Sequence, residues 1–301
     1  MKELFPGYYP YSNKQVKRFL DEATIVLGAS VLLDLFRISH NRTFLNIIEK
    51  KIPQDRLWLP YDTAWLYHNR LPDVIEEQIE VDNNASRYLT AFKEVIHNEH
   101  SHPFIPQDKM DKFDSFIKDI EESIESDRKF LVGCLGKHDI KKRISDLYHN
   151  RIGPEYDKTQ TLQVYDESQK RNAAQLPPCM TFSSSSLERI RHNRYVIWKQ
   201  IQQYAKENKK PVLMVLNRIT PNWFFTYKDS TILPHQYLIN EFKELTGQDI
   251  YILSAYSFLN YLLDAKDKDD EVVKLMNQLH DKPTLGNNQQ ISPISSDYNS
   301  I

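Results

Sequence analysis

The 301-residue sequence predicts an α/β fold in which a parallel sheet is flanked by helices. Three short apolar runs are the main observation, and they read TIVL at 24–27, PVLMVL at 211–216 and IYIL at 250–253. Continuous apolar runs are typical of strands that are buried on both faces of a parallel sheet. Helical patterns separate the three runs, so we expect parallel strands joined by right-handed crossovers.

The first half of the chain shows helical patterns around the first strand. A lead-in helix is expected at 13–22, and a second helix follows the strand with Leu32 and Leu35 on its apolar face. A short helix at 43–51 precedes a break at Pro60 and further helical pattern up to residue 70. A long, polar-faced helix is expected over 72 to about 101. Residues 109–126 form the clearest amphipathic helix, with apolar residues at i, i+3, i+4 and i+7.

The second half is expected to complete the sheet. Residues 136–182 are charged and rich in loop signals, and a helix follows at 187–208. A loop with two aromatic residues after Trp223 leads to a helix at 235–246 that Gly247 ends. Helices at 255–264 and 269–280 follow the last strand. We therefore expect one domain over residues 1–281, with a helical insertion at about 72–182 and a disordered tail at 282–301.

Composition excludes several classes of protein. The charge balance of 39 Lys and Arg against 41 Asp and Glu gives a net charge of -2, which does not indicate a nucleic-acid or membrane partner globally. Two distant cysteines exclude a disulfide framework or a thiolate zinc site, and 7 glycines argue against Gly-rich phosphate loops. No apolar leader or membrane-spanning run is present, so we expect a cytoplasmic protein.

The order of several segments resembles the PIN-like domain family, and specifically its large bacterial branch with a long helical insertion. The segments are IVLGASVLLDLFR (25–37), LWLPYDTAWLYHNR (57–70), HPFI (102–105), RHNRYVIWKQIQQYAKENKKPVLMVLNRITPNWF (191–224) and LINEFKELTGQDIYI (238–252). The resemblance covers about residues 20 to 262 and is weakest in the middle. It implies a nuclease fold whose strand ends gather three or four carboxylates around Mg²⁺ or Mn²⁺, cations that prefer oxygen ligands.

The acids of the family pattern are missing from this sequence. The first acid falls on Gly28, the second on Leu66 or Trp65, and the third on Arg194. The acid pair that ends the middle strand falls on Asn217 and Arg218. Two arginines at these positions would repel a divalent cation, so we expect no metal and no cofactor.

Two other acids are candidates for relocated ligands. Asp34 lies six positions past Gly28, and its ordinary role would be a polar position on the helix after the first strand. Asp62 follows Pro60, and its ordinary role would be a helix cap. If they serve as ligands, Mg²⁺ or Mn²⁺ would be required.

Two polar clusters elsewhere are candidates for binding sites. His97, His100 and His102 in HNEHSH have spacing that suits a transition metal, although a solvated helix end explains them equally simply. A basic segment holds Lys137, Lys141, Lys142 and Arg143. Together with Arg194 and Arg218, these side chains would bind the phosphates of a nucleic-acid backbone. The alternative for the basic segment is a solvated helical face.

Two hypotheses of function follow. The first is a catalytically degenerate PIN-like protein that acts by binding nucleic acid, RNA before DNA, or a protein partner. The resemblance suggests a place in a bacterial defence or toxin-type system. The second is a divalent-metal-dependent ribonuclease that uses the relocated acids Asp34 and Asp62. The sequence leaves homo-oligomerisation open.

Overall fold

The three apolar runs form one parallel sheet with the strand order β1-β2-β5. In this computed structural model, β1 covers Thr24–Leu27, β2 covers Val212–Leu216 and β5 covers Ile250–Ser254. The central strand β2 pairs with β1 on one side and with β5 on the other, both in parallel. The α/β prediction is therefore confirmed. The structure describes residues 1, 3–97, 105–136, 138–181, 185–217, 220–227 and 231–279.

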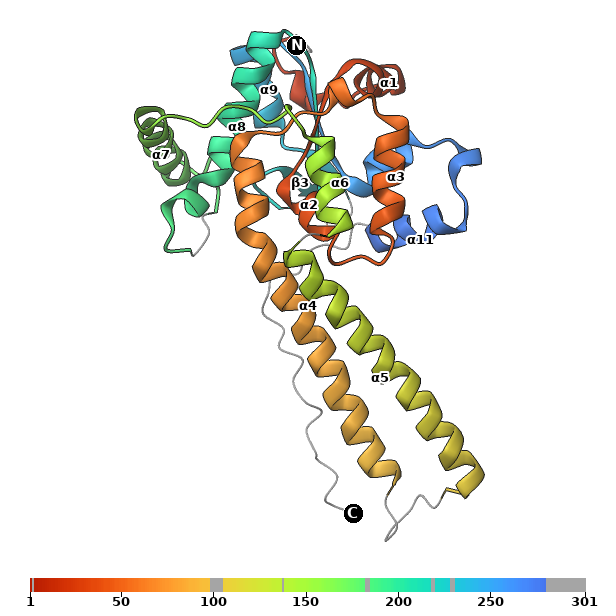
Figure 1. Cartoon of the computed structure of the whole chain (residues 1–301). Coiled ribbons are helices and arrows are strands. Elements are labelled where there is room, and N and C mark those ends of the chain that lie inside the picture. Colours follow the sequence, from red (N-terminus) through yellow and green to blue (C-terminus); the bar gives the residue numbers. More distant parts are fainter. Residues whose placement is uncertain are drawn as a thin grey trace, which may run out of the picture.

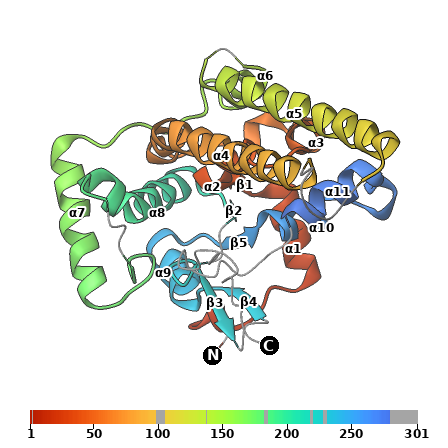
Figure 2. The same ribbon diagram turned by 90° about the horizontal axis from the view of Figure 1, so that it is seen from below.

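The sheet separates two hydrophobic cores because side chains of a strand alternate between its faces. One face carries Ile25, Leu27, Leu213, Val215 and Leu253 into the first core. The other face carries Val26, Val212, Met214, Leu216, Ile250 and Ile252 into the second core. Helices cover both faces, which gives three layers (Figure 2).

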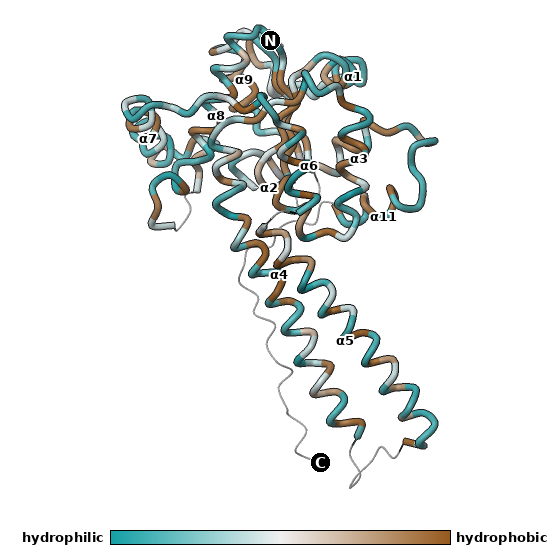
Figure 3. Tube along the Cα trace, in the orientation of Figure 1, coloured by the Kyte–Doolittle hydropathy of each residue, from teal (hydrophilic) through white to brown (hydrophobic). Residues whose placement is uncertain are grey.

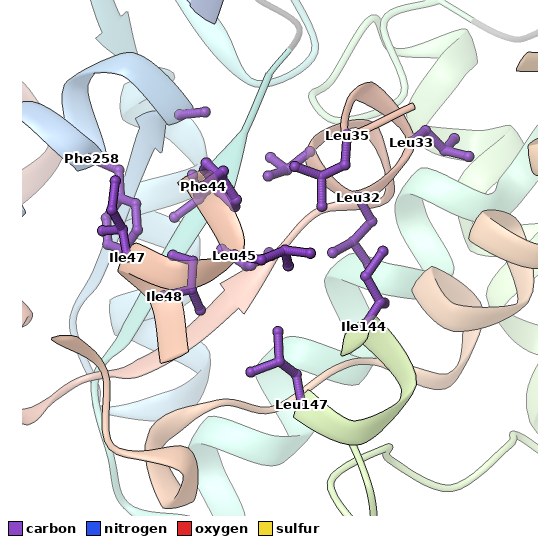
Figure 4. Close-up of a cluster of buried hydrophobic side chains, with 14 of the residues drawn as sticks. Leu32, Leu33, Leu35, Phe44, Leu45, Ile47, Ile48, Ile144, Leu147 and Phe258 are labelled. Atoms are coloured by element: carbon purple, nitrogen blue, oxygen red, sulfur yellow. The ribbon is translucent and has the colours of Figure 1, made fainter. Parts of the chain in front are cut away.

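Short helices cover the first core. The base of a helical hairpin, described below, also packs against this core. The short helices are α1 (Asn13–Glu22), α2 (Ala29–Asp34), α3 (Asn41–Lys51), α6 (Asp139–Leu147), α10 (Ala255–Leu262) and α11 (Asp270–Leu279). Figure 4 shows how Leu32 and Leu35 of the α2 region, Leu45 of α3 and Ile144 of α6 point toward one another. A capping box between Ser12 and Gln15 begins α1, which stabilises a short helix.

The second core is covered by α7 (Lys158–Ala173), α8 (Glu188–Asn208) and α9 (Gln236–Thr246). Trp198 of α8 is fully buried, and its indole N–H donates to Glu241 of α9 over 2.8 Å. Gly247 ends α9 with φ of 70°, a conformation that favours glycine. This confirms the predicted helix end.

A helical hairpin projects from the body (Figure 1). It consists of α4 (Tyr61–Ile96) and α5 (Gln107–Leu135). The helix α4 continues through Pro72, which has no N–H to bond the carbonyl of His68. The buried residues of α4 end at Ile75, so the rest of the helix lies outside the two cores.

Two parts of the fold differ from the expectation. Residues 136–182 were expected to be loop-rich, but the structure has α6 and α7 there. The segment after Trp223 forms an antiparallel pair of strands, β3 (Phe224–Tyr227) and β4 (Thr231–Pro234). Short 3-10 turns occur at Pro6–Tyr8, Gln54–Arg56 and Ala265–Asp267.

The predicted tail at 282–301 lies outside the described residues. In the described ranges, every helix is too short or too polar to cross a lipid bilayer.

Candidate functional site

The carboxyl ends of β1 and β2 bring Gly28, Ser30 and Asn217 together. The N–H of Gly28 donates to the carbonyl of Val215 over 2.8 Å, which continues the ladder between the two strands. The N–H of Asn217 donates to the hydroxyl oxygen of Ser30 over 3.1 Å. This edge of a parallel sheet is the usual place for a functional site in an α/β protein.

Gly28 is favoured here by the position of the Leu216 side chain and not by its own backbone conformation. Its φ is -65°, which any residue adopts. A Cβ atom at this position would lie 2.6 Å from Cδ2 of Leu216 and 3.2 Å from the carbonyl oxygen of Val215. Leu216 therefore fills the space that a side chain at position 28 would use.

A carboxylate does reach the strand ends, because Asp34 is the last residue of α2. The amide N–H of Asn217 donates to Oδ2 of Asp34. The guanidinium of Arg37 lies 2.6 Å from Oδ1 of the same carboxylate. Both oxygens of Asp34 are therefore occupied by donors from the protein.

Arg37 also joins α2 to α4. Its second guanidinium nitrogen lies 2.6 Å from Oε2 of Glu77. Burial acts to lower the pKa of Arg37, but the hydrogen bond to Glu77 and the charge of Asp34 together hold it above its usual value. The guanidinium is thus a fixed positive charge at the strand ends, with only a fifth of its side chain exposed.

This cluster does not fit a divalent metal ion. Such an ion needs several oxygen ligands, whereas the oxygens of Asp34 accept hydrogen bonds from Arg37 and Asn217. In the described part of the chain, no group of three or more His, Cys, Asp or Glu side chains is arranged to hold a metal.

Comparison with known protein families gives one match. A family model described as a PIN like domain matches residues 24–238. The chain belongs to the PIN-like domain family. The match spans β1, the hairpin, α8 and β2, and thus every element that supplies the strand-end cluster. No curated protein and no solved structure matches the chain.

Leu66 and Trp65, the two predicted positions of the second acid, have apolar side chains. Leu66 is half-buried against the second core, and Trp65 lies beneath the guanidinium of Arg189, whose carbon is 4.5 Å from the ring centre. Neither side chain can ligate a metal, whichever register applies.

Asp62 is buried between α4 and α8. Its Oδ1 lies 2.8 Å from Arg189, and its Oδ2 accepts from the amide of Gln200 over 2.9 Å. Gln200 in turn accepts from the backbone N–H of Asp62 over 3.2 Å. Burial raises the pKa of Asp62, and Arg189 and Gln200 lower it only in part. These contacts tie two helices together.

Arg194 lies in the first half of α8 and is half-buried. Its guanidinium donates to the carbonyl of Thr181, and burial lowers its pKa. Thr181 is held in turn by Asn222, whose amide donates to the threonine hydroxyl over 2.9 Å. Arg218 lies outside the described residues.

The basic segment is largely occupied by contacts within the protein. Arg143 makes a two-point contact with Glu49 at 2.9 and 2.7 Å, and Lys141 donates to the carbonyl of Leu135 over 3.0 Å. Lys142 is exposed, and Lys137 lies outside the described residues.

The histidine cluster is described only at His97, which lies 2.8 Å from Asp114 and links the far ends of α4 and α5. His100 and His102 lie outside the described residues.

Sequence reasoning placed Gly28 and Asn217 at the strand ends but missed Arg37 and Glu77. Arg37 is part of the segment IVLGASVLLDLFR, so its position was known while its role was not. The signal that could have found it is the i, i+3 spacing of Asp34 and Arg37, which favours an ion pair on a helix end.

Proposed function

We propose that this PIN-like protein does not cleave nucleic acid by the metal-dependent route and acts instead by binding another macromolecule. The observation that carries the proposal is the state of Asp34, whose two oxygens are occupied by Arg37 and Asn217. Gly28 and its neighbour Leu216 support it, because an acid at position 28 would require the side chain of Leu216 to move.

Electrostatics supports the proposal further. At an effective dielectric constant of 20, a guanidinium about 4 Å from a cation opposes binding by about 4 kcal/mol for each unit of cation charge. Arg37 is held by two carboxylates and shielded from water, so it does not move aside without losing both ion pairs. Under this proposal the protein carries no metal cofactor.

The occupied basic segment favours a protein partner over nucleic acid. Arg143 and Lys141 already have partners in the protein, and phosphate would have to displace them. A bacterial defence or toxin-type system, suggested by the family resemblance, is the proposed setting. Nucleic-acid binding through Arg194 and Arg218 is the alternative.

Cleavage assays test the proposal directly. Purified protein is incubated with single-stranded RNA and Mn²⁺, with and without EDTA, and Mn²⁺ binding is measured by calorimetry. We expect no cleavage that depends on the protein and no Mn²⁺ binding.

The outcome against the proposal is EDTA-sensitive cleavage that an Asp34→Asn variant loses. Asp146→Asn serves as the matched control, because Asp146 is an exposed acid of α6 away from the strand ends. EDTA-sensitive cleavage that survives in Asp34→Asn but is lost in Asp62→Asn would count against the proposal in the same way.

A further inference from the structure

The projecting part of the hairpin consists of residues 76–96 of α4 and α5 as a whole, and we call it the arm. The two helices lie side by side in both views of the molecule (Figures 1 and 2). At 1.5 Å per residue, the α4 part is about 30 Å long. Only Ile117, Leu131 and Cys134 of α5 are fully buried, so most of the arm surface faces solvent.

An apolar stripe follows the α4 side of the arm. It consists of Val81, Tyr88, Phe92 and Val95, whose exposed fractions are 60%, 75%, 52% and 61%. Their spacings of 7, 4 and 3 residues place all four on one face of the helix. Apolar residues alternate with polar ones along the arm in Figure 3.

The stripe has a neighbour on α5. Phe92 contacts Phe113, with ring centres 5.6 Å apart, and Phe116 lies one turn further along α5 with 63% of its surface exposed. Single exposed apolar residues are ordinary, but a periodic stripe on a projecting helix is typical of a protein-binding surface.

The charge of the arm indicates which class of partner it can bind. The α4 and α5 parts of the arm contain thirteen acidic and seven basic residues. This excess of negative charge repels the phosphates of nucleic acid and also repels a second copy of the same arm.

We propose that the arm binds an amphipathic helix of a partner protein that carries Lys or Arg beside its apolar face. Helix-in-groove recognition uses apolar anchors at i, i+3, i+4 and i+7, which matches the spacing of the stripe. The 15 residues from Val81 to Val95 span about 21 Å, so the partner helix needs about four turns. The proposal extends the binding role inferred above to a named surface and class of partner.

A synthetic peptide tests the proposal on the full-length protein. The probe is an 18-residue amphipathic helix with Leu on one face and Lys on both flanks, and its twin has Glu in place of each Lys. Fluorescence anisotropy measures both affinities. We expect the Lys peptide to bind at least tenfold more tightly than the Glu peptide, and the difference to shrink as salt is raised.

The stripe variant is Tyr88→Ser with Val95→Ser. The matched control is Leu162→Ser with Val273→Ser, which removes exposed apolar residues from α7 and α11. Circular dichroism confirms that both variants are folded. We expect the stripe variant to lose at least tenfold in affinity for the Lys peptide, and the control to change less than twofold.

Three results would overturn the proposal. They are equal binding by the stripe variant and wild type, equal binding of the Glu and Lys peptides, and a dimer seen by light scattering that the stripe variant abolishes. The last result would assign the stripe to a second copy of the chain. None of these readouts involves metal or RNA cleavage, so a failure here is distinct from a failure of the proposed inactivity.

Discussion

Gly28 and Leu216 share one small space at the end of the sheet, and this pair determines what the strand ends can hold. The family resemblance predicts an acid at position 28, and here a Cβ atom at that position would lie 2.6 Å from Cδ2 of Leu216. The second residue that matters is Arg37, whose charge takes the place of a cation beside Asp34. The loss of the acid and the gain of a fixed positive charge act in the same direction.

Restoring the acid alone is therefore expected to fail. In Gly28→Asp, the new Cβ meets Leu216 at 2.6 Å, so we expect a loss of stability of about 1–2 kcal/mol, typical of overpacking. Adding Leu216→Ala removes the clash, and we expect the double variant to lose no more stability than Leu216→Ala alone. Urea unfolding measures both, and Gly28→Ser separates the steric effect from the charge. Tight Mn²⁺ binding by Gly28→Asp would contradict this account.

At the scale of single residues, the sequence predicted on which element a residue lies but not which side chains it contacts. The apolar patterns predicted that Gly28 and Asn217 follow strands and that Arg194 lies on a helix, and the structure has them there. The pairing of Arg37 with both Asp34 and Glu77 depends on how α2 packs against α4, and no local pattern contains that information.

At the scale of elements, the polar contact between α4 and α8 fixes the start of the hairpin. Asp62, Arg189 and Gln200 form it, and Arg189 also lies over the rings of Tyr61 and Trp65 at 5.4 and 4.5 Å. The contact explains why an acid can be buried at this point without a metal.

Substitution of Asp62 separates this structural role from a catalytic one. Asp62→Ala leaves Arg189 and Gln200 without their acceptor, so we expect it to lower the free energy of unfolding by about 2 kcal/mol. The loss is no larger because Arg189 is partly exposed and can bond to water. Asp62→Asn keeps an acceptor and should change stability by less than about 1 kcal/mol at neutral pH.

The pH dependence follows from the raised pKa of Asp62. The folded protein holds the proton of Asp62 more tightly than the unfolded chain does. Ionised Asp62 therefore lowers stability at neutral pH, and this cost disappears as pH falls through the folded pKa. We therefore expect the difference in stability between Asp62→Asn and wild type to be most favourable to the variant at neutral pH. This difference should decrease toward pH 4, as measured by thermal unfolding of both proteins. The reverse trend would show that the ion pair outweighs burial.

The helix that the sequence missed, α7, has a weak apolar pattern. Only Val164 and Ser168 of α7 are buried, so its sequence has no clear apolar face. In α6 the i, i+4, i+7 pattern of Ile140, Ile144 and Leu147 is present, and the helical face left open for the basic segment is what the structure shows. Helices that contact the core with one edge are difficult to predict from periodicity alone.

At the scale of the whole molecule, charge is divided between an acidic arm and a body in which Arg143, Arg189 and several other described basic residues form ion pairs. The sequence predicted this only as a net charge of -2, because overall charge does not reveal which side chains meet in space. The division argues against a continuous track for nucleic acid.

Single-stranded RNA is accordingly expected to bind no more tightly than the non-specific range of about 1–100 µM at physiological salt. We expect Arg194→Ala with Arg218→Ala to change this affinity less than twofold in a filter-binding assay. Lys142→Ala serves as a control for a single exposed charge. Sub-micromolar binding that the double variant abolishes would instead support the nucleic-acid alternative.

Pro72 gives the arm an adjustable direction. Its missing hydrogen bond lies where α4 leaves the body, and helices bend most readily at such a point. The end of α4 lies about 36 Å beyond it, so a bend of about 5° swings the tip by about 3 Å. Glu77 lies five residues past this pivot and is held by Arg37, so the ion pair restrains the swing. Only Glu77 of this pair is exposed, with 52% of its side chain open to solvent, and a partner that pulls on the tip acts on the pair through this residue. Force on the arm is thereby transmitted to Arg37 at the strand ends.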